Sequence, residues 1–318
     1  MSADADRLSR PAGAFSITAP PPSHGTLALN AAPSRAADFR VLLKPGISIF
    51  VTVTAAAGYL FGATAGIDLP AFVALLAGTA LTAGGSGALN HVWERRPDAL
   101  MARTRNRPIP SGRIRADVAV AYGLAALALG LAVLALFVNS LTTWLAALTS
   151  VAYVLVYTPL KRKTWHNTFV GAVPGALPAL GGYAAATGTL GAGGWAAFAI
   201  VFLWQLPHFF SLAWMYRADY ANGGFAMLPS FDPSGRKTAF VALVSSLLLV
   251  IAGVVPTALG ITGWIYLIGM AGLGTWFTLP AFSFFNAPTD PRARRLLLAS
   301  IVYVPAFFAL VVLDYFLL

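Results

Sequence analysis

The chain has 318 residues, of which 58% are hydrophobic and only 10% are charged. Soluble domains carry ~25% charged residues, so this composition excludes an ordinary soluble protein and indicates an integral membrane protein. There is no cysteine, which excludes disulfides, thiolate metal sites and a cysteine nucleophile. The net charge is +10, but the basic residues are dispersed among short loops, so we expect no nucleic-acid binding.

Residues 1–37 are rich in Ala, Pro and Ser and contain no apolar core of a signal peptide. We expect a disordered N-terminal tail over 1–37, because such a segment buries too little apolar surface to fold. The remainder, 38–318, is expected to form one transmembrane domain.

This domain is predicted to be all-α, because its apolar segments have the ~20 residues that a spanning helix needs and are too long for barrel strands. We expect about nine transmembrane helices, near 46–65, 70–90, 117–138, 142–159, 167–187, 195–216, 238–260, 262–285 and 296–317. Prolines inside or at the ends of these spans suggest kinks around a central cavity: Pro159, Pro174, Pro178 and Pro207.

The basic residues predict the orientation of the chain. All 21 Lys and Arg residues lie in the N-terminal segment or in the loops after the second, fourth, sixth and eighth spans. Because positive charge collects in cytoplasmic loops, the N-terminus and the polar loops are expected in the cytoplasm and the C-terminus outside. A bacterial inner membrane is expected, since no mitochondrial transit peptide is clear.

The most polar stretch is 90–115, directly after the second span. Asn90, Glu94 and Asp98 fall at i, i+4 and i+8, so on a helix their side chains share one face. A run of arginines follows: Arg103, Arg105, Arg107, Arg113 and Arg115. Oxygen ligands beside guanidinium groups suit a phosphate bound with Mg²⁺.

A plainer interpretation of this stretch is a solvated helix end. In that case the acidic side chains form ion pairs with Arg95 and Arg96. Pro97 also interrupts the spacing, because its ring clashes with the carbonyl of Trp93, and this makes the angular position of Asp98 uncertain.

A second polar cluster closes the sixth span and contains His208, Arg217 and Asp219. Asp219 adds a carboxylate to the first cluster if the second and sixth spans face each other; otherwise it is a loop partner of Arg217. His208 lies in an apolar aromatic run, where it is either a hydrogen-bonded packing residue or a group that contacts haem or transfers a proton.

A third cluster follows the fourth span and contains Lys161, Arg162 and Lys163. These cations could hold a diphosphate or a propionate. The alternative is a loop whose positive charge only sets the topology.

Together, the three clusters resemble the UbiA-type intramembrane prenyltransferase superfamily and, within it, the branch that makes haem O. The resemblance covers about 38–317 and is carried by NHVWERRPD (90–98), MARTRNRPIPSG (101–112), YTPLKRKT (157–164), WQLPH (204–208) and YRADY (216–220). Two departures leave the number of metal ions open. The superfamily commonly has Asp where this chain has Glu94, and often has paired acids where this chain has Asp219 alone.

The resemblance implies nine helices around a cavity and transfer of a farnesyl group from farnesyl diphosphate to a vinyl group of haem B. Water adds in the same reaction, giving haem O and diphosphate. The residues implied to bind Mg²⁺ and carry catalysis are Asn90, Glu94, Asp98 and Asp219. Those implied to bind the substrates are Arg103, Arg107, Lys161, Arg162, Arg217 and His208.

Other functions are compatible with the same residues. One is a UbiA-type enzyme that prenylates an aromatic acid or quinone precursor, with the same diphosphate site and a different acceptor pocket. Another is a transporter or channel, although transporters usually place their polar sites near the membrane midplane rather than at one face. If haem O is the product, a haem A synthase or an oxidase-assembly factor is a possible partner.

Overall fold

The computed structural model describes residues 34–317. Within this range, nine helical spans are long and apolar enough to cross a membrane, as predicted. They are α2 (Pro45–Gly62), α3 (Leu69–Trp93), α5 (Ala116–Phe137), the continuous α6–η1–α7 segment (Ser140–Leu160), α8 (Asn167–Thr187), α9 (Ala192–Met215), α12 (Arg236–Ala258), α13 (Trp264–Asn286) and α14 (Asp290–Leu317).

The N-terminal boundary of the folded domain differs from the prediction. Helix α1 spans Arg35–Leu42, and the Ser34 side chain caps it by accepting a hydrogen bond from the Ala37 amide at 3.2 Å. Residues 35–37, expected in the tail, therefore belong to a helix. The predicted disorder of 1–33 lies outside the described residues.

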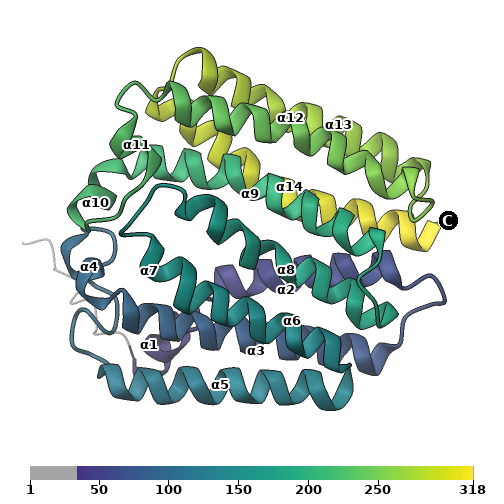
Figure 1. Ribbon diagram of the computed structural model, residues 1–318, viewed down its shortest axis with the longest axis horizontal. Coiled ribbons are helices and arrows are strands. Elements are labelled where there is room, and N and C mark those ends of the chain that lie inside the picture. The colour runs from purple at the N-terminus through teal and green to yellow at the C-terminus, as the bar shows by residue number, and fades with distance from the viewer. Residues whose placement is uncertain (1–33, 318) are drawn as a thin grey trace, which may run out of the picture. The chain divides into compact units, whose positions relative to one another are not determined.

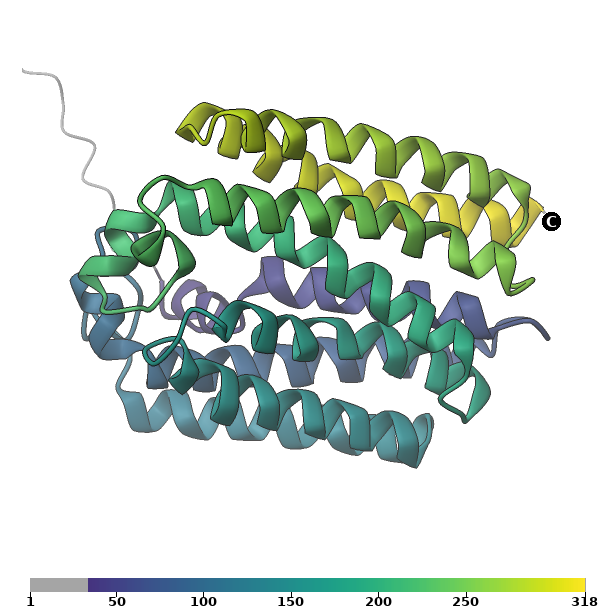
Figure 2. The same cartoon turned by 45° about the horizontal axis from the view of Figure 1, so that its top comes forward.

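The spans run side by side, and short helices that connect them or precede them gather at one end of the bundle (Figures 1 and 2). These elements are α1, α4 (Arg95–Leu100), α10 (Arg217–Asn222) and α11 (Leu228–Phe231). The C-terminus lies at the opposite end (Figure 1). Helix α2 packs against α8 and α3 against α5, while α9 joins α8 to the group formed by α12, α13 and α14. All three predicted polar clusters therefore lie at the same end.

Glycine allows α2 and α8 to approach closely. A Cβ atom on Gly182 would lie 1.8 Å from the carbonyl oxygen of Ala55, and one on Gly58 would lie 1.8 Å from that of Ala179. No side chain fits at either place. The contact is reciprocal, and it illustrates how small residues let helix backbones approach each other in membranes.

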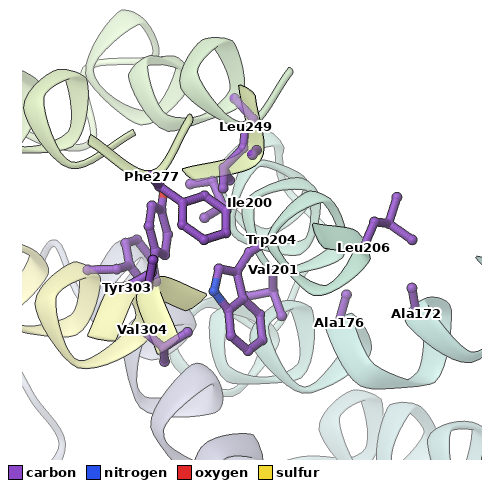
Figure 3. Packing of buried hydrophobic residues seen from close by; sticks show 14 of the residues in the cluster. Ala172, Ala176, Ile200, Val201, Trp204, Leu206, Leu249, Phe277, Tyr303 and Val304 are labelled. Atoms are coloured by element: carbon purple, nitrogen blue, oxygen red, sulfur yellow. The ribbon is translucent and has the colours of Figure 1, made fainter. Parts of the chain in front are cut away.

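The apolar interior lies between α8, α9 and the three C-terminal spans (Figure 3). Trp204 on α9 is buried there with Phe277 and Tyr303, and its indole nitrogen donates a 2.9 Å hydrogen bond to the carbonyl of Ser300 on α14. Between α6 and α7 the chain forms one π-helical segment, η1 (Ala152–Tyr157). Such wide turns are rare and are frequently found at functional sites, and this one leads directly into the third polar cluster.

Candidate active site

The first polar cluster keeps its helical register across Pro97. Helix α3 ends at Trp93 and α4 begins at Arg95, but the Glu94 amide donates to the Asn90 carbonyl at 2.9 Å and the Asp98 amide donates to the Glu94 carbonyl at 2.8 Å. The helix is therefore interrupted close to Pro97, but Asp98 keeps its i+8 position on the same helical face as Asn90 and Glu94.

The side chains of this cluster are buried, with Asn90 at 0%, Glu94 at 6% and Asp98 at 1% exposure. The solvated helix end is therefore wrong. Arg95 donates instead to the carbonyl of Val92, at 2.8 Å.

Each buried carboxylate of the cluster has a basic partner from another segment. Lys161 donates to Glu94 Oε1 at 2.8 Å, and Arg107 donates to Asp98 Oδ2 at 2.7 Å. The Asn90 amide nitrogen donates to the Thr158 hydroxyl at 2.8 Å. The structure therefore brings the first and third clusters together, with Arg107 of the arginine run beside them.

Lys44 is a member of this site that sequence analysis did not identify. It precedes α2, and its ammonium group donates to Asn90 Oδ1 and, at 3.3 Å, to the hydroxyl of Tyr153 on η1. Its φ of +47° is the only positive φ of a non-glycine residue within 34–317. Such strain persists where surrounding contacts enforce it, often at functional sites. The one local signal was a lone lysine immediately before the Pro-Gly start of an apolar span.

Burial and charge shift the pKa values of the four ionisable groups. Burial lowers the pKa of Lys44 to about 7, even though Glu94 opposes this shift. Burial also raises the pKa of Asp98, against the effect of Arg107. For Glu94, burial raises the pKa but the charges of Lys161 and Lys44 outweigh it, so the net shift is downward. For Lys161, burial lowers the pKa but Glu94 outweighs it, so the pKa lies well above its usual value.

The second polar cluster approaches the first through short helices at the polar end of the bundle. Helix α10, which carries Asp219, packs against α4. Asp219 is partly exposed and forms no ion pair within 34–317. Arg217 does not face it: its guanidinium pairs with Asp290 at 2.7 Å and lies 4.6 Å from the Trp214 ring. The alternative interpretation, in which Asp219 is a loop partner of Arg217, is therefore wrong, and Arg217 is turned toward α14.

Two other predicted phosphate ligands occupy different positions. The Arg103 guanidinium lies over the rings of Tyr216 and Tyr220, at 5.1 and 5.5 Å, so it joins the first loop to the second. Arg162 is exposed and lines a cavity of about 560 Å³ that Glu94 and Thr158 also line. Arg162 therefore reaches the site, whereas Arg103 is engaged with aromatic rings beside it.

Backbone contacts tie the second and third loops together. The Ala226 amide donates to the Lys161 carbonyl at 2.7 Å, and the Asn167 side chain donates to the Ala226 carbonyl at 2.8 Å. Gly223 also lies close to the first loop, since a Cβ there would be 3.0 Å from Met101 Sδ. The three loops thus form one cap over the polar end of the bundle.

His208 lies apart from this cap, about 10 Å along α9 from the helix end at Met215. Its Nδ1 is 2.8 Å from the Ser300 hydroxyl, and its ring stacks on Trp204 with centroids 5.3 Å apart. As one of the two interpretations of the sequence proposed, His208 is a packing residue whose Nδ1 atom is hydrogen-bonded. Nε2 makes no hydrogen bond to any residue within 34–317.

The oxygen atoms of the cap fit a hard cation. Among the described residues, no three His, Asp or Glu side chains gather into a ready metal site. The cluster offers two carboxylates and the Asn90 amide oxygen, and Asp98 Oδ1 is buried without a hydrogen-bond partner. Carboxylate and amide oxygens are the ligands that Mg²⁺ accepts, usually together with substrate phosphates.

Residues 51–311, most of the membrane domain, match the model of the UbiA prenyltransferase family. The chain belongs to the UbiA prenyltransferase family. It is 51% identical over 280 residues to "Protoheme IX farnesyltransferase" of Salinibacter ruber, an alignment that covers 88% of this chain and 99% of that protein. The sequence similarity to this family therefore extends over nearly the whole membrane domain.

Solved structures of UbiA-type proteins share the fold. A structure described as digeranylgeranylglyceryl phosphate synthase matches with a TM-score of 0.73 and 19% identity, covering 89% of this chain and 99% of that one. A UbiA homologue from Archaeoglobus fulgidus bound to GPP and Mg²⁺ matches with a TM-score of 0.65 and 20% identity, covering 86% and 99%. At this identity they establish the all-α fold, as predicted, and not the substrate.

Proposed function

We propose that this UbiA-family protein transfers a farnesyl group from farnesyl diphosphate to a vinyl group of haem B, with addition of water, giving haem O and diphosphate. The observation that carries this proposal is the 51% identity to a protoheme IX farnesyltransferase along 99% of that protein. The buried oxygen and cation cluster at one end of the bundle supports it, because a diphosphate leaving group needs such a site.

The cluster would bind the diphosphate through its cations. Lys161, Arg107 and Lys44 converge on Glu94, Asp98 and Asn90. When a diphosphate enters, the same cations would pair with phosphate oxygens, and the side chains that they now hold would become free to bind Mg²⁺. Asn90, Glu94 and Asp98 would then hold Mg²⁺, with Asp219 added from α10. The ion would neutralise charge on the diphosphate as it leaves.

Arg162 and Arg103 have more peripheral roles in this proposal. Arg162 would meet the diphosphate from the cavity that it shares with Glu94. Arg103 would hold the cap closed through the Tyr216 and Tyr220 rings. Arg217 would stabilise the α9–α14 end through Asp290 rather than bind substrate.

The transfer itself takes place on carbon. The C1–O bond of farnesyl diphosphate breaks, and diphosphate leaves with the bonding electrons. The terminal vinyl carbon of haem B then attacks the allylic cation. Water adds to the cation formed on the haem side and loses a proton, which leaves a hydroxyl group. The apolar interior of α9 and the C-terminal spans would exclude water during the first step.

We also infer the placement of the site in the membrane. All 21 Lys and Arg residues lie in the N-terminal segment, in alternate loops or at the starts of the helices that follow those loops, so the cap would face the cytoplasm and the C-terminus the opposite side. A bacterial inner membrane fits the Salinibacter relative.

Mass spectrometry of the products tests the proposal. Purified full-length protein in detergent is incubated with haem B, farnesyl diphosphate and Mg²⁺, with and without EDTA. Glu94→Gln is compared with Asp117→Asn, a matched loss of a carboxylate that is exposed at the same end of the bundle and pairs with Arg115. We expect Mg²⁺-dependent haem O, a loss of about 10²–10³ in rate for Glu94→Gln and an unchanged rate for Asp117→Asn.

Two results would contradict the proposal. Prenylation of an aromatic acid without haem O would make the protein a quinone-pathway type of UbiA enzyme. Haem O formation at an unchanged rate by Glu94→Gln would remove the buried cluster from the reaction.

A further inference from the structure

His208 is held by three contacts from two helices. Its Nδ1 is 2.8 Å from Ser300 Oγ on α14, its ring stacks on Trp204, and the edge of Phe209 lies against it with centroids 5.5 Å apart. Trp204 itself donates to the Ser300 carbonyl, and Phe50 of α2 stacks on its ring at 4.7 Å. The imidazole therefore has a defined orientation where α2, α9 and α14 meet.

The Ser300 hydroxyl determines which nitrogen of His208 carries the proton. Ser300 Oγ is 2.6 Å from the Leu297 carbonyl oxygen, a separation of two oxygens that requires a hydrogen between them. The single hydroxyl hydrogen is thus donated to Leu297, and Oγ can only accept from His208. Nδ1 must therefore bear the proton, and Nε2 carries a free lone pair.

This arrangement is the one that histidine adopts as a metal ligand. Such a histidine donates its second ring N–H to an oxygen, and that bond fixes the tautomer and the ring orientation. Ser300 is fully buried, His208 is only partly buried, and Nε2 is neither hydrogen-bonded within 34–317 nor among the enclosed unpaired atoms. Nε2 therefore keeps an unpaired lone pair and is not completely enclosed by the residues around it.

We propose that Ser300 is a positioning residue that fixes the Nδ1–H tautomer of His208, so that Nε2 ligates the iron of bound haem B. The inference rests on the proposed function, because it requires haem as the acceptor. It adds the residue that prepares the imidazole and the atom that meets the iron. Iron ligation at this point would anchor the haem plane in the apolar interior, away from the charged cap.

The test combines a measurement without haem and one with it. Nitrogen-15 NMR of histidine-labelled full-length protein reports which ring nitrogen of His208 is protonated, with His208→Ala used for assignment. Titration with haem B then follows the Soret band. Ser300→Ala is compared with Ser246→Ala, another fully buried serine, whose hydroxyl donates to the Ala242 carbonyl in α12.

We expect an unprotonated Nε2 in the wild type and a mixture of tautomers in Ser300→Ala. Haem affinity should fall about five-fold in Ser300→Ala, which corresponds to one hydrogen bond of ~1 kcal/mol. His208→Ala should lose the Soret shift, and Ser246→Ala should match the wild type in both measurements.

Specific outcomes would overturn the proposal. A protonated Nε2 in the wild type would contradict the tautomer directly. A protein that makes haem O while His208→Ala and Ser300→Ala leave its Soret band unchanged would refute iron ligation and leave the proposed function standing. Absence of haem O together with absence of haem binding would instead remove the proposed function, and this inference with it.

Discussion

The ion pair between Lys161 and Glu94 should be strongly coupled in the ligand-free protein. Glu94 is 6% exposed, and Lys161 donates to it at 2.8 Å. Lys161→Met removes this partner and leaves a buried carboxylate without it. The pKa of Glu94, which Lys161 and Lys44 now hold down against the effect of burial, should then rise.

The size of the effect follows from burial. Removing one partner of a buried ion pair costs ~3–5 kcal/mol, because the remaining charge stays desolvated. Lys44 lies close enough to compensate in part, so we expect the lower end, about 3 kcal/mol, for Lys161→Met. Changing both residues, in Glu94→Gln/Lys161→Met, removes both charges and should cost much less than the sum of the single changes. The coupling energy should therefore exceed ~2 kcal/mol.

Reversible unfolding in mixed detergent micelles measures this coupling through a double-mutant cycle. The control cycle uses the Arg115–Asp117 pair, whose side chains are 79% and 61% exposed, and it should show no measurable coupling. Additive effects of Lys161→Met and Glu94→Gln would refute the reasoning, since they would mean that the pair is solvated in the native protein. All variants with a changed Glu94 should also lose about 10²–10³ in rate, so unfolding and product formation are measured separately.

Two further predictions concern packing and protonation. Gly182→Ala should prevent the α2–α8 contact, because the added Cβ would lie 1.8 Å from the Ala55 carbonyl oxygen. Size-exclusion chromatography should then show little folded protein. The control Gly272→Ala, whose added Cβ would have no atom within 4 Å, should fold normally. At pH 8 the side-chain amine of Lys44 is mostly neutral before ligand binding, because its pKa is about 7. Binding of a non-hydrolysable farnesyl diphosphate analogue in the presence of EDTA should therefore be accompanied by the uptake of up to one proton. Calorimetry in buffers of different ionisation enthalpy should show this uptake in the wild type and in Lys237→Met, but not in Lys44→Met.

The fold was predictable because lipid restricts the possible structures. Each span must be helical and ~20 residues long to pair its backbone groups in the membrane. Because every span reverses the direction of the chain, the alternation of basic and uncharged loops also supports the count of the spans. The structure has the expected number of spans within 34–317. The boundary at Ser34 was not predictable from composition, because α1 is short and polar and Arg113 fixes its Asp38 through a 2.9 Å hydrogen bond from a loop far along the chain.

The candidate site was predictable only where its residues follow helical spacing. Asn90, Glu94 and Asp98 are related by the period of one helix, so the sequence contains their geometry. Lys44 is 46 residues from Asn90, and their contact depends on how α2 packs against α3. No local pattern encodes that distance.

Arg217 shows why the same limit applies to ion pairs in loops. The nearest acid in sequence is Asp219, two residues away, but the guanidinium reaches Asp290, which is 73 residues away in sequence. On the short helix α10, side chains two positions apart point in different directions, so nearness in sequence does not bring these charges together. The start of α14 lies beside the end of α9, and it offers Arg217 a carboxylate in the direction that its side chain takes. To decide whether a charged loop residue binds substrate, one therefore needs the positions of all the helix ends around it. Those positions are set by helix packing along the whole bundle.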